Sequence, residues 1–294
     1  MDYRNVIKNR ELRLKLINLM RFIPNKPYLR FVYYMTTGRK LHLRNPRGFS
    51  EKQNWMKIYE PCYEYSKYVD KIAVRDIIST KLGKDYLIPL LGVWNSYEEI
   101  DFELLPNQFV LKCNHDSGST VIVKDKSQLD HKKLARFYNG RLKLNAYVLG
   151  RECPYRDVPP KIIAEKLMVE KDKADISDYK FLCFNGEPKL MYVASERSSD
   201  VRLDFYDMNY SHLDVNTDHI NADVEPTRTP LFEEMKKTAT KLSEGFKFVR
   251  IDLYDINGRI YFGEYTFYHS GGFVVFKPEE VELELGNLLQ INAK

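Results

Sequence analysis

Two runs near the C-terminal end of the chain alternate apolar and polar residues. The runs cover 249–254 and 260–265, and a two-residue period is typical of β-strands with one buried face. Asn257 and Gly258 lie between the runs, and both residues tolerate the positive φ angles of a tight hairpin turn. The pattern therefore predicts a β-hairpin, with several charged residues on one face.

The rest of the chain changes character near residue 85, from helical periodicity to a region rich in strands. Ser50 is expected to cap its helix, with Gln53 completing a capping box. Asn185 and Gly186 predict the turn of a second hairpin. Helices are predicted around 12–23, 28–35 and 50–58, and at 66–82, 130–145, 231–244 and 278–289. Strands are predicted at 87–94, 108–113, 120–123, 161–168, 178–184, 188–194 and 201–206.

Composition adds limits to this picture. A chain of 294 residues with 44% hydrophobic residues can bury a large core. No stretch approaches the ~18 consecutive apolar residues of a membrane-spanning helix, and no signal-peptide pattern is evident, which together predict a cytoplasmic protein. The cysteines are scattered without a CxxC pair, so we expect free thiols rather than a zinc site or disulfide framework. They are Cys62, Cys113, Cys153 and Cys183.

The net charge of +5 is concentrated at the start of the chain. Residues 1–49 contain twelve Lys or Arg residues and only two acidic residues. Leu12, Leu16, Leu19 and Ile23 recur at helical spacing among them, which predicts a basic amphipathic helix. Such a helix packs on its own domain, or it lies on an anionic membrane or binds a polyanionic substrate. Nucleic acid is not expected as a partner, because no recognised binding motif accompanies the charge.

The hairpin brings two carboxylates together. Asp252 and Glu264 are expected on neighbouring strands, where two like charges need a metal, a basic partner or a proton. Mg²⁺ suits them because it prefers one or two carboxylates plus substrate phosphates. Arg250 shares a strand face with Asp252 and is suited to binding a phosphate. The alternative is a solvated face on which Arg250 simply pairs with the two acids.

A short polar loop is predicted between the strands at 108–113 and 120–123. It contains Ser117, Gly118 and Ser119, and Lys112 precedes it. Backbone N–H groups and hydroxyls of such a loop can surround a phosphate while lysines supply charge. With one glycine and no GxxxxGK[ST] spacing, it differs from a P-loop, and an ordinary hairpin loop is the alternative.

Glu165 interrupts the apolar strand at 161–168. A charge in a buried strand is costly without a partner, so Glu165 is a candidate for contacting a polar edge of a ligand. The alternative is a strand that emerges into solvent at this point.

The order of these motifs resembles the ATP-grasp enzymes, and in particular the TupA-like branch associated with bacterial polysaccharide and teichuronopeptide biosynthesis. The resemblance covers about 70–273, and it implies an α+β ATP-grasp fold in which two mostly antiparallel subdomains hold the nucleotide. The implied division is a helical, basic region at 1–85, a small subdomain at 86–165 and a large subdomain at 166–294.

The same resemblance implies roles for particular residues. Asp70 and Lys71 match the DK pair that opens the family's nucleotide-binding region, and both Lys71 and Lys112 would contact ATP phosphates. Asp178 would hold the ribose. The segment that meets the adenine would be Glu165, Lys166, Leu167 and Met168.

The family's metal signature is an R-x-D strand followed by an E-x-N strand. Arg250 and Asp252 match the first, and Glu264 matches the metal-bridging glutamate. Thr266 replaces the usual Asn, and a hydroxyl is a weaker Mg²⁺ ligand than an amide oxygen. ATP and Mg²⁺ are the implied cofactors.

The implied reaction is amide formation from a carboxylate and an amine through an acyl phosphate, with Lys112 and Arg250 stabilising the transferring phosphoryl group. The TupA-like branch suggests a uronic acid of a polysaccharide or its precursor as the acid, and an amino acid as the amine. Arg202 is a candidate for binding the carboxylate, or it pairs with Asp204. His269 is a candidate for binding substrate or deprotonating the amine, or it is structural.

Other classes of function remain open at this stage. One is a glycosyltransferase of polysaccharide synthesis. Against it, the sequence has no convincing DxD motif at a strand end, and that function would leave Lys112 and Glu165 unexplained. An ATP-grasp kinase would stop at phosphoryl transfer to a sugar hydroxyl. A scaffold at the inner face of the membrane would use the basic helix and bind no nucleotide.

Overall fold

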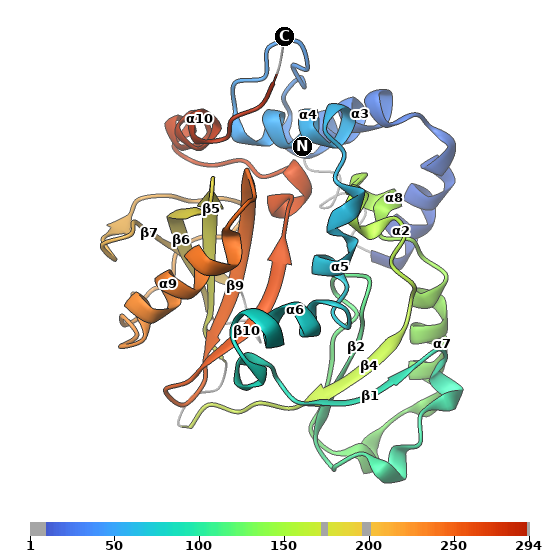
Figure 1. Ribbon diagram of the computed structural model, residues 1–294. Coiled ribbons are helices and arrows are strands. Elements are labelled where there is room, and N and C mark those ends of the chain that lie inside the picture. The colour runs from blue at the N-terminus through green and yellow to red at the C-terminus, as the bar shows by residue number, and fades with distance from the viewer. Residues whose placement is uncertain (1–9, 172–175, 196–200, 293–294) are drawn as a thin grey trace.

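The computed structural model describes residues 10–171, 176–195 and 201–292, and it contains two β-sheets with helices packed around them (Figure 1). The smaller sheet has the strand order β1-β4-β2-β3, and the larger has the order β10-β9-β5-β6-β7-β8. All neighbouring strands are antiparallel. Residues 167–171 follow β4 and run from the smaller sheet toward the larger one (Figure 1). The predicted α+β class is confirmed.

The larger sheet is built on the two predicted hairpins. Its strands are β5 (Asp178–Phe184), β6 (Glu187–Ser195), β7 (Arg202–Tyr206), β8 (His212–Leu213), β9 (Phe248–Asp255) and β10 (Ile260–Thr266). In the β9–β10 turn, Asn257 has a φ of 53° and Gly258 a φ of 75°. Asn185 and Gly186 have φ values of 52° and 83° in the β5–β6 turn. These left-handed values explain why Asn-Gly pairs form both turns, so both hairpin predictions are confirmed.

The smaller sheet is covered on one face by α7 (His131–Leu142). Its strands are β1 (Leu90–Trp94), β2 (Phe109–Cys113), β3 (Val121–Val123) and β4 (Ile162–Lys166). Tyr138 of α7 lies in one buried cluster with Phe109 and Leu111 of β2. Because side chains alternate across a strand, Val110 and Lys112 point to the opposite face.

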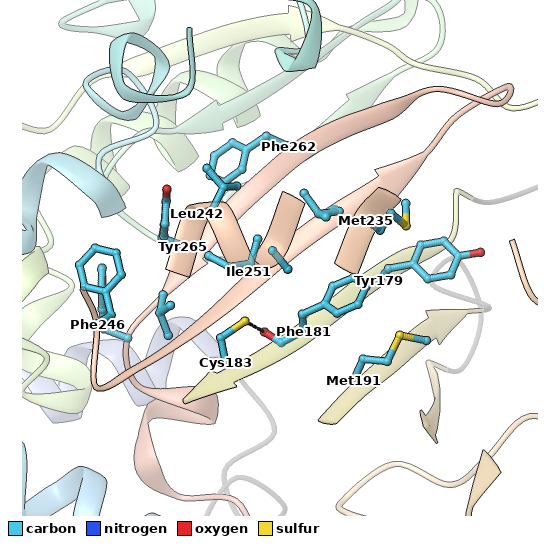
Figure 2. Close-up of a cluster of buried hydrophobic side chains, with 14 of the residues drawn as sticks. Tyr179, Phe181, Cys183, Met191, Met235, Leu242, Phe246, Ile251, Phe262 and Tyr265 are labelled. Carbon is cyan, nitrogen blue, oxygen red and sulfur yellow. Dashed lines mark hydrogen bonds between the residues drawn. The ribbon is translucent and has the colours of Figure 1, made fainter. Parts of the chain in front are cut away.

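The main hydrophobic core lies between the larger sheet and α9 (Phe232–Ser243), as Figure 2 shows. Met235 and Leu242 of α9 belong to one buried cluster with Phe181 and Ile251 of the sheet. The opposite face has a second apolar cluster, to which α4 (Phe49–Tyr59) and α10 (Glu279–Leu288) contribute. Asp178 and Lys180 of β5 and Arg250 and Asp252 of β9 share this second face.

The start of α4 differs from its prediction. The helix begins at Phe49 with Gly48 as its N-cap, so the predicted cap at Ser50 is wrong. The Glu51 carboxylate accepts hydrogen bonds from the N–H groups of Arg47 (3.0 Å) and Gly48 (3.3 Å). The Ser50 N–H instead donates to Glu282 Oε1 of α10 at 2.6 Å, because α10 approaches this end of α4.

The helix predicted at 66–82 is interrupted. The structure has α5 (Ser66–Val69) and α6 (Val74–Lys81) with a turn between them. In the turn, Asp70 Oδ1 accepts hydrogen bonds from the Ile72 N–H (2.9 Å) and from Asn114 Nδ2 (2.8 Å). A side chain that bonds the backbone two residues onward competes with helical hydrogen bonds, which accounts for the break.

The first helices form an outlying part of the molecule at the upper right of Figure 1. They are α2 (Arg10–Leu19), the 3₁₀ turn η1 (Met20–Phe22) and α3 (Asn25–Thr37), which ends at Gly38 as expected. Leu14 and Ile17 are buried, whereas Leu16 and Leu19 are exposed. The Leu12 side chain lies outside the described residues. Throughout the described chain, no helix combines the length and apolar character needed to span a bilayer.

Candidate active site

Lys112 and Glu165 are neighbours on the face of the smaller sheet that α7 leaves uncovered. In the β2–β4 pair, Val110 lies opposite Glu165 and Lys112 opposite Ile163. Lys112 Nζ is 2.6 Å from Glu165 Oε2, and Arg75 Nη1 of α6 is 3.6 Å from Glu165 Oε1. Glu165 is only 7% exposed, so the strand does not simply emerge into solvent there. Its carboxylate is neutralised by two cations and orients Lys112.

Lys71 lies in the turn between α5 and α6, against the loop that follows β2. Its Nζ donates to the backbone oxygens of Asp116 (2.6 Å) and Asn114 (3.4 Å). Burial lowers the pKa of Lys71, and the charges of Glu264 and Glu165 act in the opposite direction. Because Glu264 belongs to the larger sheet and Glu165 to the smaller one, Lys71 lies where the two sheets meet.

The polar loop between β2 and β3 is held by its own contacts. The buried Ser119 hydroxyl donates to Asp116 Oδ1 at 2.5 Å, and Arg141 of α7 donates to the Gly118 carbonyl at 2.9 Å. Ser117 and Gly118 form the exposed tip. The structure therefore leaves the tip exposed, whereas the hydroxyl of Ser119, a predicted phosphate contact, is engaged within the loop.

An apolar strip lies on the same sheet face as Lys112. Val93 pairs with Ile163, and Ile122 pairs with Val110, and Val93 and Ile122 are 37% and 57% exposed. In the predicted adenine-contacting segment, Glu165 lies on this face, whereas the exposed Lys166 lies opposite Phe109 at the end of β4, on the face that α7 covers. Leu167 and Met168 follow β4 and are half-buried.

Arg250 is at the centre of a charged group on the larger sheet. β9 lies between β10 and β5, so Asp252 is opposite Glu264 on one side and Lys180 on the other. Arg250 Nε and Nη2 each donate to an Asp252 oxygen at 2.7 Å, and Nη2 also donates to Glu264 Oε1 at 2.8 Å. Lys180 Nζ contacts Asp252 Oδ2 and lies 2.6 Å from Asp178 Oδ2.

The charges in this group keep its cations protonated. Burial alone would lower the pKa of Lys180 and of Arg250, but the neighbouring carboxylates raise both pKa values above their usual range. Three carboxylates against two cations leave this face with a net negative charge, which suits a metal ion. The three are Asp178, Asp252 and Glu264.

Asp178, the predicted ribose contact, is 1% exposed and its carboxylate is paired with Lys180. In this structure its clearest role is to neutralise that lysine. A ribose contact by this carboxylate stays a prediction.

The structure does not bring Arg202 to the site. Lys180 lies opposite Tyr192 of β6, whereas Arg202 lies opposite Ser195. Residues three apart on a strand face opposite sides of the sheet, so Arg202 is on the face that α9 covers. There its Nη1 donates to the Asn221 carbonyl at 3.5 Å. The strand was predicted, but the face of the sheet on which Arg202 lies was not.

His269 opens the 3₁₀ turn η8 (His269–Gly272) that follows β10. It is 3% exposed, and its Nδ1 lies 3.3 Å from Arg250 Nη1. Burial and the charge of Arg250 hold the pKa of His269 well below its usual range. The neutral ring therefore accepts a hydrogen bond from Arg250, and a pKa this low makes it a weak general base at neutral pH.

Of the two hairpin carboxylates, Glu264 is the one open to a magnesium ion that arrives with phosphates. Among the described residues, no group of three or more His, Cys, Asp or Glu side chains forms a ready metal cage. Glu264 is 37% exposed, while both oxygens of Asp252 already bind Arg250 or Lys180. Mg²⁺ needs only one or two carboxylates besides substrate phosphates. The Thr266 hydroxyl donates to Glu264 Oε1 at 3.1 Å and so orients that carboxylate.

Two features of the site escaped prediction. Lys180 was missed, although its place two residues after Asp178 put both on one strand face. Glu152 lies between α8 (Tyr147–Gly150) and the 3₁₀ turn η7 (Cys153–Tyr155). Burial raises the pKa of Glu152 to about 7, and it interacts electrostatically with Lys57, Glu264 and Arg250. No sequence signal indicates the role of Glu152, because these interactions form only when elements distant in the sequence come together.

Several solved structures are similar at low identity. D-alanine–D-alanine ligase from Bacillus anthracis, complexed with ATP, is 16% identical with a TM-score of 0.41, over 67% of this chain and 54% of that chain. The ATP-grasp ligase PsnB with a minimal precursor is 10% identical with a TM-score of 0.42, over 82% and 65%. N5-carboxyaminoimidazole ribonucleotide synthetase from Thermus thermophilus is 9% identical with a TM-score of 0.42, over 76% and 52%. The chain thus spans about half to two thirds of their lengths.

No curated protein matches the chain. The model of the family described as TupA-like ATPgrasp matches residues 51–290, which include both sheets and every residue of the site described above. With a match over most of its length, this chain belongs to the TupA-like ATP-grasp family, and its two antiparallel sheets are those of an ATP-grasp fold.

Proposed function

We propose that this protein is an ATP- and magnesium-dependent ligase that joins a carboxylate to an amine through an acyl phosphate. The observation that supports it most is that charged groups from the two sheets approach each other. Lys71 and Lys112 come from the side of the smaller sheet, and Arg250 with Glu264 from the larger one. Lys71 interacts electrostatically with both Glu264 and Lys112, so the two groups lie near each other.

The smaller sheet would supply the nucleotide site. Lys71 and Lys112 are suited to bind ATP phosphates, and the exposed apolar strip of Val93 and Ile122 offers a surface for a base. Lys166, at the end of β4, and Leu167 and Met168, on the connection that follows, would contact the base. Ser117 and Gly118, at the exposed loop tip, would contact phosphates.

The larger sheet would supply the phosphoryl-transfer site. An oxygen of the substrate carboxylate attacks the γ-phosphorus of ATP, the bond to the β-phosphate oxygen breaks, and ADP leaves. The amine then attacks the acyl carbon, inorganic phosphate leaves and the nitrogen loses a proton. Arg250 stabilises the charge on the transferring phosphoryl group. Mg²⁺, held by Glu264 and Asp252, would neutralise phosphate charge.

We further propose a uronic acid of a bacterial polysaccharide, such as a capsule, O-antigen or teichuronic polymer or its precursor, as the acid, with an amino acid as the amine. The resemblance to the TupA-like branch supports this choice. The basic residues at 1–49 suit an acidic, nucleotide-linked or lipid-linked sugar. The enzyme would work in the cytoplasm, in peripheral contact with an anionic membrane.

The proposal is tested by measuring ADP release from Mg·ATP with pooled amino acids and uronic-acid sugars. We expect release only when both pools are present. Glu264→Gln should reduce it at least about a hundredfold, since a ligand of the metal is lost while the side-chain shape is kept. Glu284→Gln, at an exposed position of α10, is the matched control and should leave the rate unchanged.

The other outcomes separate the alternatives. ADP release that needs a sugar alone would identify a kinase, and full activity of Glu264→Gln would refute the metal assignment. Absence of both release and thermal stabilisation by Mg·ATP would contradict an ATP-dependent enzyme. Donor hydrolysis of a UDP-sugar without ATP would then indicate a glycosyltransferase.

A further inference from the structure

The end of α2 and the turn η1 expose apolar side chains that a folded domain normally buries. Leu19 and Phe22 are 74% and 80% exposed, and the neighbouring Leu16 and Ile23 are also open to solvent. On the same segment Leu14 and Ile17 are buried. The helix therefore packs one apolar side on the protein and leaves another outside. We call Leu16, Leu19, Phe22 and Ile23 the apolar tip.

The apolar tip is held firmly by the rest of the chain. Arg151 Nη2 donates to the backbone oxygens of Met20 (2.9 Å) and Ile23 (3.2 Å). The Arg151 guanidinium also lies 4.2 Å from the ring centre of Tyr28, whose hydroxyl donates to the Leu149 carbonyl at 2.8 Å. These contacts hold the backbone on either side of Phe22 against the rest of the protein.

Positive charge surrounds the tip. Arg21 and Lys26 are exposed, and the Arg21 guanidinium lies 4.7 Å from the ring centre of Phe22. Arg30 is exposed on α3 together with the apolar residues Phe31 and Tyr34. The sequence contains no Asp or Glu from residue 12 to residue 50. Nothing acidic within this segment offsets its charge.

We propose that the apolar tip inserts into the surface of an anionic lipid bilayer, with Arg21 and Lys26 contacting lipid phosphates. An apolar side chain set among basic ones matches the boundary between acyl chains and negatively charged headgroups. The charge complementarity favours lipid over a second copy of this chain, whose tip would bring the same positive charge. This inference rests on the membrane contact in the proposed function and assigns it to particular residues, but its test needs neither nucleotide nor substrate and so stands apart from the catalytic test.

The test is co-sedimentation of the full chain with vesicles of phosphatidylcholine alone or mixed with phosphatidylglycerol. We expect binding to the mixed vesicles that weakens as salt is raised. The double variant Leu19→Ser/Phe22→Ser should lower the partition coefficient at least about tenfold, since two large apolar groups no longer insert. Arg21→Glu/Lys26→Glu should abolish the preference for anionic lipid.

Leu104→Ser/Val224→Ser is the matched control, because those residues are 83% and 82% exposed elsewhere on the chain; it should bind like the parent protein. Thermal unfolding checks that every variant is folded. Equal binding to neutral and anionic vesicles, or unchanged binding of the tip variant, would overturn the proposal. So would concentration-dependent dimerisation that the tip variant loses without any vesicle binding, since it would make the tip a contact between copies.

Discussion

At the scale of single residues, Lys180 is a cation held between two buried carboxylates of the site. It contacts Asp252 and Asp178, each 1% exposed. Taking these charges out of water is costly, and their mutual attraction offsets that cost only while every partner is present. Arg250 binds Asp252 from the other side, so the charges form one connected group in which Lys180 joins the two aspartates.

Lys180→Met should therefore lower the free energy of unfolding by about 3–5 kcal/mol, because it leaves buried carboxylates uncompensated. Urea denaturation measures the change. Lys189→Met removes an exposed lysine of β6 from its ion pair with Glu187 on the same strand. It should lower the free energy of unfolding by less than about 1 kcal/mol. Equal effects of the two substitutions would show that the buried group contributes no more than a surface pair.

At the scale of secondary-structure elements, α10 and α4 pack unusually closely. A Cβ placed on Gly286 would lie 2.2 Å from the Arg47 carbonyl, so α10 approaches the start of α4 only with glycine there. The same approach buries Glu282, whose Oε1 accepts the Ser50 N–H. Burial raises the pKa of Glu282 to about 7, although the Ser50 hydrogen bonds favour the ionised form.

A carboxyl group with a raised pKa in the folded state makes unfolding easier as pH rises. Between the usual pKa of 4.5 and about 7, the folded protein holds a proton that the unfolded chain releases. Glu282 should therefore lower the free energy of unfolding by ~3 kcal/mol across this window, with no further change above it. The Glu282→Gln variant, which keeps the acceptor oxygen, should lack this loss.

Urea denaturation of the parent protein and of Glu282→Gln at several pH values measures this loss of stability. The contributions of other titrating groups cancel when the two free energies of unfolding are subtracted. Glu280→Gln, exposed on the same turn of α10, should retain the parental pH dependence. Parallel curves for the parent protein and Glu282→Gln would disprove the buried titration.

At the scale of the whole molecule, the two sheets meet at the turn that contains Lys71. This lysine is bound to the loop after β2 and interacts with acidic residues of both sheets. A nucleotide between the sheets would add negative charge beside it. Binding of Mg·ATP should therefore depend on Lys71, and it should stabilise the whole chain.

We expect Mg·ATP at about a hundred times its dissociation constant to stabilise the protein by ~2.7 kcal/mol. Lys71→Met should weaken binding about tenfold or more, so the same concentration would add no more than ~1.4 kcal/mol. Chemical denaturation with and without Mg·ATP measures both values against each variant's own baseline. Lys67→Met, exposed on α5, should behave like the parent protein, and an unchanged gain for Lys71→Met would exclude its contact with the nucleotide.

Much of the fold could be predicted because its signals are local. Alternation of apolar and polar residues indicated β9 and β10, and the Asn257-Gly258 pair indicated their turn, since few other residues adopt positive φ without strain. The pairing of Asp252 with Glu264 followed from that hairpin. The order of Lys71, Lys112, Arg250 and Glu264 along the chain was enough to indicate the family.

Local pattern was insufficient where a distant partner decides the outcome. Asp70 breaks the predicted helix at 66–82 partly through Asn114, which is far along the chain. The Ser50 N–H bonds α10 rather than its own helix. Arg202 lies on the sheet face that α9 covers. The register of β6 with β7 places it opposite Ser195, and alternate residues of a strand point to opposite faces.

The sequence by itself therefore determined the hairpins, the fold class and the residue types of the candidate site, since turn conformation, strand periodicity and residue type are properties of short segments. Only the tertiary structure decided that Glu165 neutralises Lys112 and Arg75, that Lys180 shares Asp252 with Arg250, and that the apolar tip stays exposed. Each of these depends on which elements approach one another and on how much water they exclude, and burial and charge pairing are properties of the assembled molecule.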